Sequence, residues 1–336
     1  MGRELDFGIV SLLESLFDSL SRIMSHKRSS DSNDLRAEPI VGYEWARLGV
    51  GTDSIVLLLP TTGAAAMPKQ DLEHITIDPN AQYQVIIGET SRSENISVIA
   101  TKGLDGWLVT TFLELTAMLL QASQSPSPQS VQQFIRDLVS LFRALTQPST
   151  RTLQGLWGEL FLIHQSADVG LLARAWHATP KDRYDFVLGH ERLEAKTTTG
   201  PRIHTFGHLQ LAPVSGLRVT VASMILLPSA DGTSCGDLTA LITQRLEDRE
   251  LQNGFVKQVV KSVGDNWQGQ AGVKFDLNHA SNALRFFDVV EIPRVTGVIP
   301  AEVSGISYQS DIQMTKELAP NVLGPTDRLT RAAMNV

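Results

Sequence analysis

Residues 183–198, RYDFVLGHERLEAKTT, constrain the fold of this chain more than any other segment. Residues on both sides of Gly189-His190-Glu191 have the character of strands, which predicts two strands joined by a tight turn. Side chains of a strand alternate between its faces, so Glu194 and Lys196 point to the same side. If the two strands pair, Asp185 lies on the neighbouring strand within reach of Glu194. The segment therefore predicts a β-hairpin that brings two carboxylates and a lysine together.

Two carboxylates beside a lysine are typical of a metal site with a neighbouring cation. Mg²⁺ prefers oxygen ligands and keeps several waters, so Asp185 and Glu194 with a substrate phosphate suffice to hold it, and Mn²⁺ can replace it. A bound metal polarises a phosphoryl oxygen and activates a water, while Lys196 orients that water or offsets developing charge. In the alternative interpretation, Glu194 and Lys196 form a solvated ion pair and Asp185 is an ordinary acid at a strand edge.

Three further elements are expected around the hairpin. Apolar residues recur at three- and four-residue steps in residues 150–167 and predict a helix. Residues 171–177 and 217–227 are expected to form strands. Within the helix, Gly155 and Gly158 each lower helix stability by about 1 kcal/mol relative to alanine, so they indicate close packing against a sheet or close approach of a substrate.

The motifs of this region resemble those of the PD-(D/E)XK nuclease superfamily, and more narrowly a prokaryotic group called PD-(D/E)XK motif proteins. The resemblance covers residues 151–211 of the 336. The proline of the motif's name is replaced by Tyr184. The matching runs, in chain order, are Gly155-Leu156-Trp157-Gly158-Glu159-Leu160, Arg183-Tyr184-Asp185-Phe186, Glu194-Ala195-Lys196 with the three threonines after it, Arg202-Ile203-His204 and Gln210-Leu211.

This resemblance implies a restriction-endonuclease-like αβββαβ core in a protein of the α+β or α/β class. It implies that Asp185 and Glu194 bind the metal and that Lys196 is the catalytic lysine. It also implies that Glu159, an acidic residue on the first helix, takes part in catalysis and in metal binding. The expected contacts to nucleic acid come from Arg183, Arg202, His204 and Gln210.

The activity implied by the resemblance is Mg²⁺-dependent hydrolysis of phosphodiester bonds by an endodeoxyribonuclease of restriction or phage defence. The implied partners are DNA and either a second copy of the chain or other subunits of a defence system. Two alternatives stay open, a non-catalytic subunit that binds nucleic acid or protein with the same fold, and a nuclease that acts on RNA. A zinc site at His204 and His208, which are four residues apart, lacks a third ligand at a persuasive spacing.

The charge of the chain restricts where nucleic acid could bind. A net charge of −7 gives no whole-molecule attraction to phosphates, so any DNA site must be local. Residues 171–220 hold seven basic and four acidic side chains, although a window of this length also drifts by a few charges by chance. The single cysteine, Cys235, excludes an internal disulfide and a cysteine-based zinc cluster and favours a reducing cytoplasm.

Four parts are expected along the chain. Residues 1–39 contain an amphipathic helix at 7–24, neither a signal peptide nor a membrane span, and a polar linker. Residues 40–105 carry short runs of Val, Ile and Leu and predict a small β-rich subdomain. Residues 106–230 begin with two helices, at 107–122 and 131–145, and continue into the nuclease core.

The fourth part, residues 231–336, is expected to be helical or mixed. One or two helices are predicted between residues 237 and 263, with a break at Asn253-Gly254. Residues 274–290 and 295–303 are expected to be strands or irregular segments. Beyond Tyr308 the chain is polar and shows no clear pattern.

Overall fold

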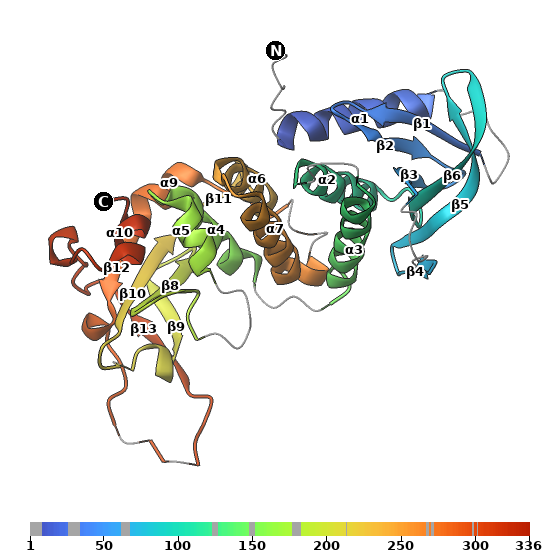
Figure 1. Ribbon diagram of the computed structural model, residues 1–336. Helices are drawn as coiled ribbons and strands as arrows, with labels where there is room; N and C mark the ends of the chain where they lie inside the picture. Colours follow the sequence, from blue (N-terminus) through green and yellow to red (C-terminus); the bar gives the residue numbers. More distant parts are fainter. Residues whose placement is uncertain are drawn as a thin grey trace. The chain divides into compact units, whose positions relative to one another are not determined.

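A computed structural model describes residues 9–25, 34–61, 68–122, 127–147, 152–176, 183–212, 214–266, 269, 272–297, 299–300 and 302–336. The chain forms two compact units, an amino-terminal unit of Met1–Gln147 and a carboxy-terminal unit of Pro148–Val336 (Figure 1). The two helices expected at the start of the nuclease part thus lie in the amino-terminal unit. The four-part division of the chain itself stays a prediction.

The amino-terminal unit is built on a six-stranded sheet in the order β1-β2-β3-β6-β5-β4. The first strand has partners on both sides, because β1 pairs antiparallel with β2 and parallel with β5. The sheet therefore curls back on itself (Figure 1). The elements of the unit are α1 (Ile9–Ser25), β1 (Asp34–Ile40), β2 (Tyr43–Val50), β3 (Ile55–Pro60), β4 (Gln70–Asp71), β5 (Ile75–Ile87), β6 (Thr90–Thr101), α2 (Gly106–Ala122) and α3 (Pro128–Ala144).

The helices of this unit follow the periodicities of the sequence. In α1, Leu12, Leu16, Leu20 and Ile23 are buried at steps of four and three residues, which confirms the amphipathic helix. The pair predicted at residues 107–122 and 131–145 corresponds to α2 and α3. None of the helices in the described ranges combines the length and the apolar character that crossing a membrane requires.

The carboxy-terminal unit contains a four-stranded sheet in the order β12-β10-β8-β7 and a separate two-stranded sheet of β13 and β9. Strands β8 and β10 are parallel, whereas β7 and β12 run antiparallel to their neighbours. The elements are α4 (Leu153–Gln165), α5 (Val169–Ala175), β7 (Phe186–Leu188), β8 (Glu191–Thr198), β9 (Ile203–Gly207), the 3₁₀ helix η1 (His208–Gln210), β10 (Arg218–Ile225), β11 (Pro228–Thr233), α6 (Cys235–Arg245), α7 (Arg249–Val263), η2 (Gly264–Asn266), α9 (Leu277–Ala283), β12 (Arg285–Asp288), η3 (Val289–Glu291), β13 (Ser307–Asp311), η4 (Pro320–Val322) and α10 (Arg328–Met334).

Helix α4 packs directly on one face of the four-stranded sheet. A Cβ atom added at Gly158 would lie 2.3 Å from Thr197 Cγ2 and 3.2 Å from Met224 Cε, so glycine is required for this approach. Of the two explanations for Gly158, close packing against a sheet is the one observed. The opposite face, which carries Glu194 and Val221, is covered by an apolar cluster that includes Phe206 and Ile312.

Two predicted elements of this unit are wrong. The strand expected at residues 171–177 is not formed, because residues 171–175 belong to the short helix α5, which Asp168 caps by accepting a hydrogen bond from Leu171 N (2.8 Å); His177 lies outside the described residues. The break in the following helical region does not lie at Asn253-Gly254. It lies at residues 246–248, where Asp248 caps the start of α7, and Gly254 sits inside that helix.

The mixed α and β character of the carboxy-terminal unit agrees with the expected fold class, whereas the αβββαβ order of the core stays a prediction. Between α4 and β10 the chain forms α5, β7, β8, β9 and η1, and β9 pairs with β13 and not with the larger sheet. Residues 277–283, expected to be strand or irregular, form α9. The region beyond Tyr308, expected to be without a pattern, ends in α10, whose Leu329 is fully buried.

Candidate functional site

The predicted hairpin positions Asp185. Strands β7 and β8 pair in the register Phe186↔Leu193 and Leu188↔Glu191, and Gly189 has a positive φ of 52° in the two-residue turn between them. Asp185 comes immediately before β7, and its Oδ2 accepts a hydrogen bond from Ala195 N on β8 (2.8 Å). This contact holds the Asp185 carboxylate against the segment that carries Glu194 and Lys196.

Glu194 and Lys196 form an ion pair in which Glu194 is buried and Lys196 is partly buried. Lys196 Nζ lies 2.8 Å from Glu194 Oε1, and the two side chains are 19% and 5% exposed, respectively. The Lys196 ammonium also lies 5.2 Å from the centroid of the Phe206 ring. A solvated surface pair would be far more exposed, so the alternative of an ordinary exposed ion pair does not describe these two residues.

Gln210 links Glu194 to the backbone of Arg183 and Gly207 through its side-chain amide. Its Nε2 donates to Glu194 Oε1 (2.8 Å) and to the carbonyl of Arg183 (3.0 Å), and its Oε1 accepts from Gly207 N (2.9 Å). Tyr184 Oη donates to the Gln210 carbonyl (3.3 Å), and burial raises the pKa of Tyr184. Gln210 therefore fixes the orientation of the Glu194 carboxylate.

His204 and Arg202 both contact Ser223 on β10. His204 is buried, and its Nε2 lies 2.7 Å from Ser223 Oγ. Burial, helped by the charges of Lys196 and Arg202, lowers the pKa of His204 to about 4, so its imidazole is neutral at neutral pH. Arg202 donates to Ser223 O (2.8 Å), Ser223 Oγ (2.7 Å) and the carbonyl of Ala283. A phosphate contact of Arg202 would have to compete with these bonds.

Glu159 is not part of the same group of side chains. It lies on α4, which packs on the sheet face opposite Glu194, and its Oε2 accepts from Trp176 Nε1 (2.7 Å). Its charge contributes, after burial, to raising the pKa of Cys235 to about 12. In the part of the chain that the structure describes, no three or more His, Cys, Asp or Glu side chains gather as a metal cluster. Of the three carboxylates predicted to bind metal, those of Asp185 and Glu194 lie on the hairpin of β7 and β8, and their role as metal ligands stays a prediction.

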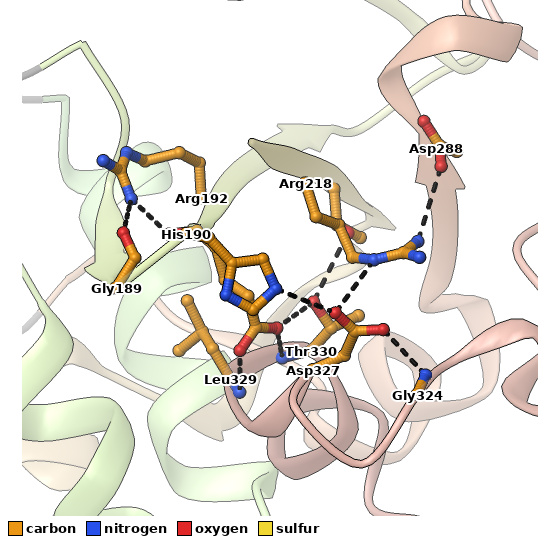
Figure 2. A network of polar contacts seen from close by, with 11 residues as sticks. Gly189, His190, Arg192, Arg218, Asp288, Gly324, Asp327, Leu329 and Thr330 are labelled. Carbon is orange, nitrogen blue, oxygen red and sulfur yellow. Dashed lines mark hydrogen bonds and ion pairs between the residues drawn. The ribbon is translucent and has the colours of Figure 1, made fainter. Parts of the chain in front are cut away.

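Glu191, the first residue of β8, belongs to a network of polar contacts that the sequence did not predict (Figure 2). Glu191, assigned to a turn, is buried, and its carboxylate accepts from Leu329 N (2.9 Å), Thr330 N (3.0 Å) and Thr330 Oγ1 (2.9 Å) at the start of α10. Beside it, Asp327 contacts Arg218 (3.1 Å) and His190 (3.3 Å). The partners lie more than a hundred residues apart, so no local pattern could have revealed them.

A family model described as "Putative PD-(D/E)XK family member, (DUF4420)" matches residues 45–313, from within β2 to just beyond β13. The match thus includes parts of both compact units. No curated protein and no solved structure matches the chain.

Proposed function

The chain belongs to this PD-(D/E)XK family, and from that premise we propose that it is a metal-dependent DNA endonuclease of restriction or phage defence. The observation that supports the proposal best is the arrangement of Asp185, Glu194 and Lys196 on the hairpin of β7 and β8, in which Glu194 is buried and the other two are partly buried. The three residue types are those that metal-assisted hydrolysis of a phosphodiester requires. Their arrangement follows from one local element.

The two carboxylates fit a hard divalent cation. Mg²⁺ is held in enzymes by one or two carboxylates together with waters and substrate phosphates, so Asp185 and Glu194 are a sufficient set, and Mn²⁺ accepts the same ligands. Hydrogen bonds from Gln210 and Ala195 orient these two carboxylates, as outer contacts do at metal sites. When bound, the ion polarises the phosphoryl oxygen and makes a water a better nucleophile.

The other side chains have separate tasks in this proposal. Lys196 donates a hydrogen bond to the attacking water or to a phosphate oxygen, and its shielding from solvent strengthens that interaction. Glu159 acts at a distance: it holds Trp176, whose backbone bridges that of Phe186, the residue after Asp185. His204 and Arg202 brace β10 through Ser223 beside Lys196.

Cleavage of plasmid and phage DNA by the purified protein with Mg²⁺ or Mn²⁺ tests this function. Asp185→Asn, which keeps an oxygen for the Ala195 N–H, and Lys196→Ala are each expected to lower the rate roughly 100- to 1,000-fold. Asp231→Ala, on an exposed residue of β11, is the control and should cut at the wild-type rate. Wild-type activity in Asp185→Asn would refute the assignment.

Metal binding separates this function from its alternatives. A non-catalytic binding subunit of a defence complex should show no saturable Mn²⁺ binding that depends on Asp185 and Glu194. Metal binding without cleavage would indicate an enzyme that needs partner subunits or a second copy of itself, because cutting both strands takes two such sites. Cleavage of RNA but not DNA would change the substrate and keep the chemistry.

A further inference from the structure

A hollow of about 690 Å³ lies next to the candidate site, between η1 and residues 299–307. One wall is formed by Arg183, His208, Leu209 and Gln210, and the other includes Val303. Its volume is within the range of roughly 300–1,000 Å³ that ligand pockets have. None of the residues proposed to bind metal or assist water lines it, so its role is separate from the chemistry.

Gln210 connects the hollow with the proposed metal ligands. The side chain lines the hollow, and its Nε2 donates both to Glu194 Oε1 (2.8 Å) and to the carbonyl of Arg183 (3.0 Å). A group bound in the hollow therefore lies one side chain away from Glu194. If Glu194 helps to hold a phosphate of a nucleic-acid strand, the nucleotides next to that phosphate are the ones closest to the hollow.

The lining suits a flat, partly apolar group attached to an anion. Leu209 is 56% exposed and Val303 48% exposed, so the hollow offers apolar surface that no described residue covers. Arg183 supplies a positive charge, and none of the described residues that line the hollow is acidic. Apolar surface beside a cation matches a nucleobase on its phosphate backbone.

We propose that this hollow receives a nucleobase of the substrate strand, rotated out of the base stack, beside the phosphate held at Asp185 and Glu194. The proposal rests on the nuclease function above and adds a means of selection. Extruding a base costs free energy for unstacking and unpairing, and this cost is lowest for a base that is mismatched, damaged or unpaired. The enzyme would therefore cut fastest where such a base lies next to the cleaved bond.

Duplexes that carry the fluorescent base 2-aminopurine at successive positions test the proposal, with Ca²⁺ in place of Mg²⁺ to keep the DNA intact. Wild-type protein should raise the fluorescence several-fold at one position near the cleaved bond, because the probe base leaves the stack. Val303→Trp, which fills the hollow, should abolish that rise and leave Mn²⁺ binding unchanged. Val322→Trp, at a residue of similar exposure (56%) outside the hollow, is the matched control and should behave as wild type.

The outcomes separate this inference from the function on which it rests. Unchanged fluorescence at every position, with DNA cleavage and Mn²⁺ binding intact, would overturn the base-binding hollow alone. A rise that persists in Val303→Trp would overturn it as well, since the base would then be elsewhere. If the wild-type protein neither cleaves DNA nor binds Mn²⁺, the nuclease function is overturned, and the inference with it.

Discussion

Removal of the Glu191 carboxylate is expected to destabilise the carboxy-terminal unit by about 3–5 kcal/mol. The side chain is 1% exposed and accepts three hydrogen bonds, from Leu329 N, Thr330 N and Thr330 Oγ1. Glu191→Ala leaves these donors buried, and each unsatisfied donor costs about 1–3 kcal/mol. The start of α10 also loses a neighbouring acceptor, an effect of up to about 1 kcal/mol. Partial access of water to the new cavity keeps the total below the full sum.

Urea unfolding followed by fluorescence of Trp157 and Trp176, which lie in the carboxy-terminal unit, measures the loss. Thr330→Val removes one of the three donors and leaves no unsatisfied hydroxyl behind, so it should lower the free energy of unfolding by only about 1 kcal/mol. Glu191→Gln keeps one acceptor oxygen and should fall between the two. The reasoning is refuted if Glu191→Ala unfolds at the same urea concentration as Thr330→Val, because the carboxylate would then not hold α10.

Three further changes test other parts of the structure. Gly158→Ala should lower the free energy of unfolding by about 1–2 kcal/mol, because overlap with Thr197 outweighs the gain in helix propensity. Gly155→Ala should leave the free energy of unfolding nearly unchanged. Equal values for the two variants in thermal unfolding would contradict the packing of α4. Because the pKa of His204 is lowered to about 4 in the folded protein, its contribution is complete above pH 6.5 and is lost as the pH falls toward 4, and His204→Asn should reduce that acid sensitivity in pH-dependent unfolding. Arg202→Ala should lower stability by about 2 kcal/mol and leave the salt dependence of DNA binding unchanged; a slope that falls by about one unit would instead identify a phosphate contact.

Local patterns of the sequence predicted the hairpin of β7 and β8 because its determinants are local. Alternation over a few residues and a glycine that adopts positive φ specify two paired strands, so Asp185, Glu194 and Lys196 follow from the segment itself. For Gly158, the low helix propensity indicated either close packing against a sheet or close approach of a substrate, and the contact with Thr197 decides for packing.

Features that depend on distant residues could not be predicted in this way. The short apolar run at residues 171–177 is equally compatible with a strand and a helix, and the cap from Asp168 decides for the helix. Glu159 carries the family's acidic position on the first helix, but its partner is Trp176. Gln210 was identified only as a match to the family, and its bond to Glu194 required the fold of η1.

The contacts of Glu191 also determine when this unit can complete its folding during synthesis. The partners of its carboxylate lie 138 and 139 residues later in the chain. While a ribosome is still translating the segments between them, the Glu191 carboxylate on β8 lacks its hydrogen-bond donors. Asp185, Glu194 and Lys196 have already been made at that stage. Full stability of β8 therefore comes only after Thr330 has left the ribosome, and nascent or prematurely terminated chains carry Asp185, Glu194 and Lys196 on an incompletely folded unit.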